Sequence, residues 1–469
     1  MKKMRNLFII YIVATGLLYP GCQSGSNAKP VKEDGKDSAM IKMITLDPGH
    51  FHAALVQKSM YPGIDSIVHV YAPDEPEVQS HLALINGYNT RKDDPTRWQE
   101  EVYKGTDFFD KMLSDKMGNV VVVAGNNKRK AEYIHRSVSA EMNLLGDKPM
   151  AIDTAGFKEL VQSFKDAAIK KVLLYDIMTE RSEISNILQR DLMRDESVFG
   201  VLQKGTLQSP AVEMESVHHF YKFVSGSALK RPAWFFDASQ QGNSIVDVGT
   251  HLADLIQWEC FPDMQIDYTK EIKLQTAKKW PTPVTLSQFK DITRLDTFPS
   301  YLHAFIKNDT ILNTDANGSV NYSIKGINVK ITARWNFKAP EGGGDTHYSK
   351  FTGTKSILII RQAKEDKYLP TVYVQPAAGN AAGFESVLTG SIKKLAAQYP
   401  GMTIEKTGNS WKVITPENLR IGHEAHFAQV MQRFLKYLKD GKLPDWEVPG
   451  MLAKYYVTTY GAAMAERVK

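Results

Sequence analysis

From about residue 40 the chain shows short apolar runs that alternate with longer amphipathic ones. The clearest apolar run, "NVVVVAGNN" at 119–127, is continuous and rich in valine, which is typical of a strand covered on both faces. Strands that alternate with helices predict a parallel sheet with helices on both sides. We therefore expect an α/β domain over residues 40–178.

The same pattern predicts the elements of this domain. Strands are expected at 40–47, 66–74, 119–127, 149–154 and 171–178, and helices at 52–60 and 128–145. The polar stretch 77–117, between the second and third strands, is interpreted as a partly helical insertion.

After about Gly200 the pattern changes to strand-like runs separated by Gly, Asp, Asn and Pro. These runs predict a second, α+β domain over 179–420, built on an open and largely antiparallel sheet. Two helices in 421–469 close the chain, and we expect them to pack back on the first domain because the second of them is apolar over much of its surface.

The first 21 residues carry an export pattern. Basic residues precede an apolar run, which predicts a signal peptide over 1–21. The following Gly21-Cys22 resembles a bacterial lipoprotein processing site, so we predict lipidation of Cys22 and a flexible tether over 22–39. The protein is then exported, as a periplasmic or outer-membrane-associated lipoprotein; an uncleaved apolar anchor is the alternative.

Composition narrows the function classes further. Loss of the signal peptide lowers the formal net charge from +6 to +3, which is too little to indicate a nucleic-acid partner. With Cys22 lipidated, Cys260 remains as a lone thiol, so no intramolecular disulfide is expected. The fold must be stabilised by packing.

The stretch "SIVDVGTHLADLIQW" at 244–258 holds the most informative spacing. A helix beginning near Val248 would project Asp247 and His251 from one side of its first turn. The helix N-terminus would keep Asp247 ionised and His251 neutral, which suits a general base for a hydroxyl, and Gly249 would leave room for a ligand. By spacing alone, a capping Asp247 with a packed His251 is the alternative.

A second candidate is Lys148, which precedes Pro149 in "GDKPMAID". Proline disfavours helix at the residue before it, so the lysine should be extended between a helix that ends near Leu145 and a strand that follows. A turn at this edge of a parallel sheet faces the crevice where ligands bind. A solvated surface lysine is the alternative.

These segments resemble the glucose-fructose oxidoreductase and inositol dehydrogenase-like family (Gfo/Idh/MocA). The resemblance rests on Asp147-Lys148-Pro149, on the run from Asp247 to His251, and on the terminal "YYVTTYGAAMAERV". It implies a Rossmann N-terminal domain and an NAD or NADP cofactor, tightly bound because free cofactor is scarce outside the cytoplasm. It also implies that Lys148 polarises the reacting oxygen, His251 is the acid/base and Asp247 orients the substrate.

The resemblance places the cofactor's phosphate loop at 47–52, where only one of the usual glycines is present. The expected cofactor-binding residues are Gly49, His50, Phe51, His52, Asp74, Asn126 and Asn127. Asp74 would contact the ribose, which favours NAD. Three interpretations of the loop stay open: a rebuilt phosphate site helped by His50 or His52, a lost site, or a metal site that uses Asp47, His50 and His52.

The substrate is expected to be a carbohydrate. His218, Trp234 and Asp237 are the candidate substrate residues, with Arg231 and His347 near them, although a core position is the alternative for Trp234. Together these observations predict an exported nicotinamide-dependent oxidoreductase acting on a secondary hydroxyl of a sugar or glycoside. An NAD-dependent glycosidase or lyase, or a carbohydrate-binding lipoprotein without activity, are the alternatives, and the C-terminal sheet is the expected surface of a homo-oligomer.

Overall fold

A computed structural model describes residues 40–224 and 227–468, so the predicted signal peptide, the tether and Cys22 lie outside the described residues. The N-terminal domain contains the strands β1 (Met43–Leu46), β2 (Ile67–Ala72), β3 (Gln99–Lys104), β4 (Val120–Val123), β5 (Asn143–Asp147) and β6 (Leu174–Ile177). They form one parallel sheet in the order β3-β2-β1-β4-β5-β6. This is the order of a Rossmann domain, as expected.

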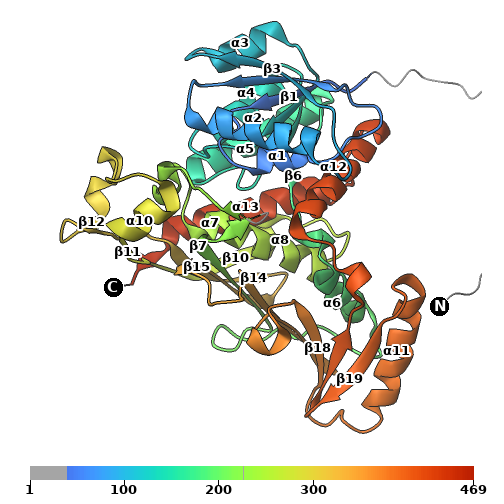
Figure 1. The fold of residues 1–469 in the computed structure, drawn as a ribbon. Helices are drawn as coiled ribbons and strands as arrows, with labels where there is room; N and C mark the ends of the chain where they lie inside the picture. The colour runs from blue at the N-terminus through green and yellow to red at the C-terminus, as the bar shows by residue number, and fades with distance from the viewer. Residues whose placement is uncertain (1–39, 225–226, 469) are drawn as a thin grey trace, which may run out of the picture. The chain divides into compact units, whose positions relative to one another are not determined.

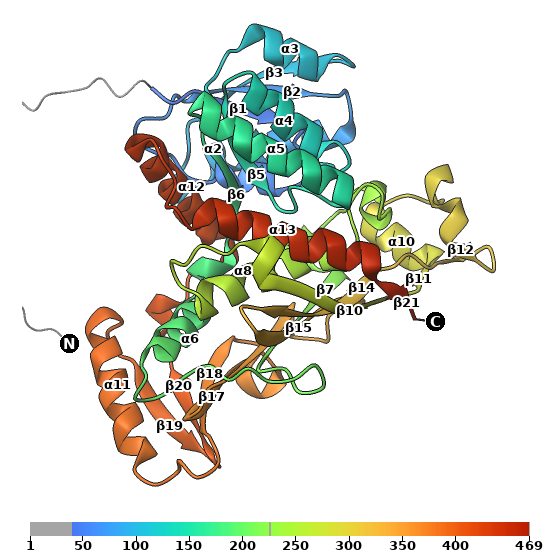
Figure 2. The same cartoon turned by 180° about the vertical axis from the view of Figure 1, so that it is seen from behind.

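Helices cover both faces of this sheet. They are α1 (His52–Val56), α2 (Pro76–Thr90), α3 (Phe108–Asp115), α4 (Lys130–Ser139) and α5 (Thr154–Lys170). One face carries α1 and α2 (Figure 1), and the other carries α4 and α5 (Figure 2). The four valines of β4 are all buried, in keeping with a central strand covered on both sides.

Two sequence-based expectations for this domain are wrong. The helix expected over 128–145 ends at Ser139, and Asn143–Asp147 forms β5, whereas 149–154 forms no strand. The supposed insertion at 77–117 contains β3, which lies at the edge of the sheet. Because an edge strand meets a neighbour on one side only, it can carry the polar residues that hid it from the pattern.

The C-terminal domain is built on a large sheet, as expected. Its strands are β7 (Val212–Tyr221), β10 (Ile272–Trp280), β14 (Asn317–Ile324), β15 (Ile327–Lys338), β16 (Thr346–Thr352), β17 (Ser356–Arg361), β18 (Thr371–Pro376), β19 (Thr403–Thr407), β20 (Ser410–Ile414) and β21 (Glu466–Arg467). Their order is β19-β20-β18-β17-β16-β7-β15-β14-β10-β21. The pairs β7·β15 and β10·β21 are parallel and the other pairs are antiparallel.

Helices and smaller sheets complete this domain. The helices are α6 (Ile184–Arg194), α7 (Ser244–Asp247), α8 (Gly249–Cys260), α9 (Tyr268–Glu271), α10 (Leu286–Thr293) and α11 (Phe384–Gln398). The smaller strands are β8 (Phe223–Val224), β9 (Ser227–Ala228), β11 (Val284–Thr285), β12 (Ile306–Lys307) and β13 (Ile311–Leu312). No helix among the described residues is both long and apolar enough to cross a membrane.

The last two helices, α12 (His423–Asp440) and α13 (Glu447–Met464), lie between the two sheets (Figure 2). Apolar side chains of α12 such as Phe427 and Phe434 belong to the core of the N-terminal domain. Helix α13 contributes Tyr455 to that core and Val457 to the core of the C-terminal domain. In the structure both closing helices thus pack against the N-terminal domain, and α13 packs against the C-terminal domain as well.

A buried ion network ties α13 to both domains. Lys454 Nζ on α13 lies 2.8 Å from Asp176 Oδ2 at β6 and 2.6 Å from Asp254 Oδ1 on α8. Arg181, just after β6, bonds both carboxylate oxygens of Asp254 at 2.6 and 2.7 Å and also contacts Glu447 at 3.0 Å. All five side chains are buried, so each charge depends on the others for the interactions it would otherwise make with water.

Candidate active site

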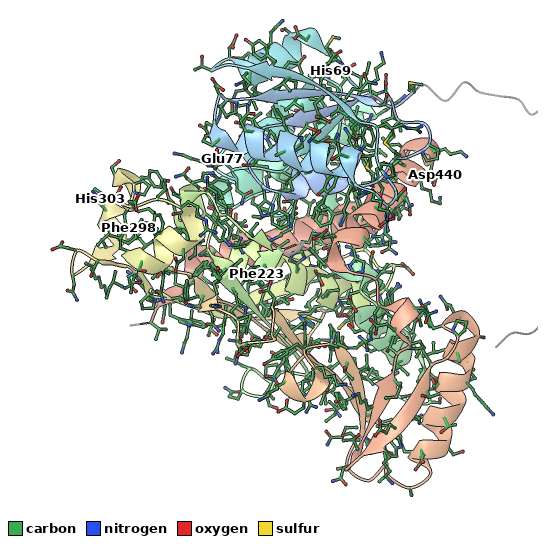
Figure 3. All side chains as sticks on the ribbon, in the orientation of Figure 1. His69, Glu77, Phe223, Phe298, His303 and Asp440 are labelled. Carbon is green, nitrogen blue, oxygen red and sulfur yellow. The ribbon has the colours of Figure 1, made fainter. Side chains whose placement is uncertain are left out.

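A cleft of about 1320 Å³ lies where the carboxyl ends of β1, β4, β5 and β6 meet the C-terminal domain. Its lining includes seven histidines: His50, His52, His218, His251, His347, His423 and His426. Phe223, labelled in Figure 3, is an exposed apolar residue of the same lining. Ligands of open α/β sheets bind at this edge, so the cleft is the candidate active site.

Lys148 and Asp247 meet in this cleft. Lys148 follows β5 directly, and its Nζ donates to Asp247 Oδ1 at 2.7 Å. Burial acts to raise the pKa of Asp247, but the charge and the hydrogen bond of Lys148, together with the nearby His218 and His50, outweigh it and lower the pKa to about 2. Helix α8 begins at Gly249 with Val248 as its N-cap, in line with the expected start near Val248. Asp247, however, is the last residue of the short helix α7, so Lys148 rather than a helix N-terminus keeps its carboxylate ionised.

His251, in the first turn of α8, faces the same cleft. Burial, and then the charge of Lys148, lowers its pKa to about 3, so the imidazole is neutral at physiological pH. Its Nδ1 is buried and has no hydrogen-bond partner among the described residues. A neutral ring with a free nitrogen beside a lysine can accept a proton from a ligand.

His50 and His52, in the turn after β1, converge on Asp147 at the end of β5. His52 Nδ1 lies 3.1 and 3.0 Å from the two carboxylate oxygens of Asp147. His50 Nδ1 lies 3.5 Å from Asp147 Oδ2, at the distance of an ion pair. Lys130, buried at the start of α4, donates to the backbone oxygen of Asp147 at 3.0 Å.

The C-terminal sheet contributes a cluster of charged side chains to the cleft. Asp345 lies 3.4 Å from His218, 3.2 Å from His219 and 2.5 Å from Lys222. Burial lowers the pKa of His218 to about 4, so its ring is neutral. Arg231 is buried beside this cluster and donates to the backbone oxygens of Phe220 and His219.

Helix α12 and the turn after β6 form another wall. His423 Nδ1 lies 3.4 Å from Glu180 Oε1. His347 Nε2 and both ring nitrogens of His426 are buried, and none of them has a hydrogen-bond partner in the part of the chain that the structure describes. Buried polar atoms are normally paired, so these free nitrogens indicate a cleft made to hold a polar ligand.

Several predicted site residues lie outside the lining of the cleft. Trp234 is a buried core aromatic whose ring edge approaches Gly49, and Asp237 caps a turn by accepting from Ser239 N at 2.8 Å. Asp74 is exposed and pairs with Lys104 at 2.5 Å. The predicted substrate role of Trp234 and Asp237 and the ribose role of Asp74 find no support in this geometry.

The remaining predictions have mixed outcomes. Asn126 and Asn127 bond Gln240 and Gln241 of the C-terminal domain, and Asn127 also lines the cleft. Gly249 does not open a path for a ligand, because a Cβ there would meet Ile331 at 3.6 Å inside the core. Phe51 lines the cleft with the two histidines that flank it.

Sequence reasoning gave no role to five residues of the site: Lys130, Asp147, Glu180, Asp345 and His426. Lys130 had a detectable signal, because it begins the buried stripe of α4 at the spacing of Tyr133, Ile134, Ser137 and Val138. A lysine on an apolar stripe is rarely buried without a partner. The others come from distant segments, and only the fold brings them together.

The nicotinamide cofactor that the fold implies fits one half of this site. Lys148 and the free nitrogen of His251 are suited to its reactive end. At the pyrophosphate end, α1 has only five residues, and a Cβ at Gly125 would lie 2.0 Å from the backbone oxygen of Asp47, so β4 closes the turn where a glycine cradle would open. Burial and the charge of Glu75 raise the pKa of Asp47, in the same turn, to about 6.

The buried histidines make stability depend on pH. Burial lowers the pKa of His218 to about 4, of His251 to about 3 and of His426 to about 4. Between pH 6.5 and about 4 the unfolded chain binds protons at these rings and the folded chain does not, so the free energy of unfolding falls as pH falls. Each imidazole ring changes the free energy of unfolding by at most about 1.4 kcal/mol per pH unit.

Denaturant unfolding of the wild type and of His426→Leu at pH 7, 6, 5 and 4 measures this effect. We expect the variant to lose one ring's share of the pH dependence. Equal slopes for the two proteins would show that folding does not lower the pKa of His426.

A family model described as "Putative oxidoreductase C terminal domain" matches residues 188–466, which is more than half of the chain. No curated protein matches. Among solved structures, a "putative oxidoreductase" from Parabacteroides merdae ATCC 43184 is 50% identical and has a TM-score of 0.89, with 91% of this chain and 98% of that chain covered.

Two more distant structures share the fold. Levoglucosan dehydrogenase, solved with NADH and L-sorbose, is 12% identical with a TM-score of 0.56, and 90% of this chain and 97% of that chain are covered. The 3-ketoreductase KijD10 from Actinomadura kijaniata, solved with NADP and TDP-benzene, is 12% identical with a TM-score of 0.54, with 91% and 98% covered. Taken with the family model, these matches show that the chain belongs to the oxidoreductase C-terminal domain family and has a fold of Gfo/Idh/MocA type.

Proposed function

We propose that this oxidoreductase transfers hydride between a secondary hydroxyl of a sugar or glycoside and a tightly bound NAD or NADP. The observation that carries the proposal is the meeting of Lys148, Asp247 and His251 in one cleft, from β5, α7 and α8. The solved relatives with the same fold support it, because levoglucosan dehydrogenase holds NADH with a sugar and KijD10 holds NADP with a nucleotide ligand.

The chain's own side chains handle the proton and the developing charge. His251 accepts the hydroxyl proton at its free Nδ1 as the alcohol becomes a ketone. Lys148, held by Asp247, presents its ammonium to the oxygen while that oxygen carries negative charge. A bound nicotinamide supplies the hydride acceptor.

Asp345 and its partners are proposed to bind the sugar. A sugar offers many hydroxyl groups, each both donor and acceptor, and Lys222, His218 and Asp345 offer complementary groups on the C-terminal wall. Trp335 lies 5.0 Å from the His218 ring and also lines the cleft, so it provides an aromatic face beside the polar groups.

A screen of sugars and glycosides tests the proposal. Protein that retains its nucleotide is mixed with each compound, and we expect at least one to change the near-ultraviolet absorbance of the nicotinamide. Product analysis then distinguishes alcohol oxidation from glycoside cleavage. If no compound changes the absorbance of nucleotide-loaded protein, the proposed reaction is wrong.

We also propose export and lipid anchoring through Cys22, supported by the order of basic, apolar and Gly-Cys elements in residues 1–22. Mass spectrometry of the N-terminal peptide from membranes of the native host is expected to begin at an acylated Cys22. Retention of residues 1–21, or an unmodified Cys22 thiol, would contradict the anchor.

A further inference from the structure

We propose that His50, His52 and Asp147 bind a divalent transition-metal ion in the cleft. The donor atoms of these three side chains favour Zn²⁺. The donors come from two places in the fold. His50 and His52 stand two residues apart in the turn after β1, and Asp147 ends β5, two strands away in the sheet. The same three residues line the cleft, so an ion there would face the bound ligand.

The distances between the three side chains suit one ion. Ligands at about 2.0–2.2 Å from a tetrahedral zinc lie roughly 3.3 Å from one another. Asp147 Oδ2 lies 3.0 Å from His52 Nδ1 and 3.5 Å from His50 Nδ1. One donor atom from each residue lies within 4.8 Å of the other two. Among the described residues no other group of three such side chains meets this distance.

The hydrogen bonds around the cluster leave its donor atoms available. His50 Nδ1 is buried, and the partner that the described residues offer it is the Asp147 carboxylate itself, at 3.5 Å. Lys130 bonds the backbone oxygen of Asp147 rather than its carboxylate, and Lys148 bonds Asp247. The hydrogen bonds and ion pairs of the Asp147 carboxylate that the described residues show are therefore those with the two histidines.

The donor set also indicates the class of metal and whether a coordination position stays open for a ligand. Two imidazoles and one carboxylate favour zinc or another late transition metal over Mg²⁺ or Ca²⁺, which prefer all-oxygen ligands. Three protein ligands leave a coordination position open, as in catalytic rather than structural zinc sites. An oxygen of the molecule in the cleft, such as a sugar hydroxyl or a phosphate, can take that position.

This metal site does not depend on the nicotinamide proposal, because the fold of the N-terminal domain alone brings its three donors together. It does explain why the turn after β1 lacks a glycine cradle. In this chain the turn after β1 places the imidazoles of His50 and His52 against Asp147 at the end of β5, and it does not present the backbone amides of a glycine-rich loop.

Metal binding to the untagged full-length protein tests the site. After chelator treatment, calorimetric titration with Zn²⁺ is expected to give one ion per chain, and titration with Mg²⁺ to give none. His50→Gln and His52→Gln should each weaken Zn²⁺ binding by at least about 100-fold, the upper end of the loss typical for residues outside the ligand sphere. His135→Gln is the matched control, because His135 Nδ1 also faces a carboxylate, that of Asp166, at 3.7 Å but without a third ligand.

Co²⁺ substitution provides a readout on the wild type that needs no folded variant. Visible absorption bands of a four- or five-coordinate Co²⁺ site without a sulfur charge-transfer band would agree with histidine and carboxylate ligands. Absence of stoichiometric Zn²⁺ binding, a sulfur band, or wild-type affinity in both glutamine variants would overturn the proposal. An equal loss of affinity in His135→Gln would overturn it too.

Discussion

Lys454→Met is expected to lower the free energy of unfolding by about 3–5 kcal/mol, because it removes one partner of a buried ion network. Lys454 is fully buried between Asp176 and Asp254, at 2.8 and 2.6 Å. Removing the ammonium leaves Asp254 with Arg181 as its cationic partner and Asp176 with the hydroxyl of Tyr455. Denaturant unfolding at pH 7 measures the loss.

Lys436→Met on α12 is the matched control. Lys436 also pairs with a carboxylate, that of Asp440, but on the exposed surface of its helix. Such a pair at i,i+4 contributes about 0.3–0.5 kcal/mol, so this variant should unfold nearly as the wild type does. If the free energy of unfolding fell equally in the two variants, burial of the ion network around Lys454 would not be the cause of its contribution to stability.

Lys148→Ala and His251→Ala are each expected to lower the turnover rate by about 10²–10⁴, the contribution of a positioned acid/base group. Lys148 stabilises the charge on the reacting oxygen and His251 accepts its proton. Because both act on one oxygen, the double variant should lose less than the product of the single losses. The measurement is single-turnover reduction of the bound nicotinamide by a sugar found in the screen.

Lys170→Ala is the control for Lys148, because Lys170 pairs with Glu141 at 3.0 Å on the surface of α5. It should turn over at the wild-type rate. Thermal melts of each variant separate a loss of chemistry from a loss of folded protein. Wild-type turnover in both Lys148→Ala and His251→Ala would mean that another cleft residue carries the reaction.

The sequence predicts the fold well where burial controls the residue pattern. The run at 119–127 is read correctly as a central strand because all four valines of β4 are buried. The sequence-based prediction fails at β3, whose mostly polar residues belong to an edge strand. It also fails at β5, because the short apolar run of this strand follows directly on the amphipathic pattern of the preceding helix. Short apolar runs do not distinguish a helix end from a strand.

The sequence predicts only those residues of the candidate site that a local motif or spacing marks. Lys148 and His251 could be found because a motif or a spacing marks each of them, and both line the cleft. Asp147 belongs to the motif that marks Lys148, but nothing in that motif indicates its histidine partners, and Glu180 and Asp345 lie in no motif that the sequence analysis identified. Their partners are His52, His423 and His218, each more than 90 residues away, so only the packed domains bring these pairs together.

Long-range contacts also decide how the predicted residues behave. The sequence attributes the ionised state of Asp247 to a helix N-terminus, whereas the structure attributes it to Lys148, 99 residues away. Trp234 is a residue type that often stacks on sugars, but the turn at Gly49 packs against its ring. Which aromatic faces a ligand is set by domain packing, and a single sequence does not show it.

The nucleotide content of the purified protein tests the central claim most directly. Full-length protein is denatured, and the released small molecules are identified and counted by chromatography with mass spectrometry. The proposed function predicts NAD or NADP, oxidised or reduced, at close to one molecule per chain. A protein that releases no nucleotide, and that binds neither cofactor when it is added, would contradict the account.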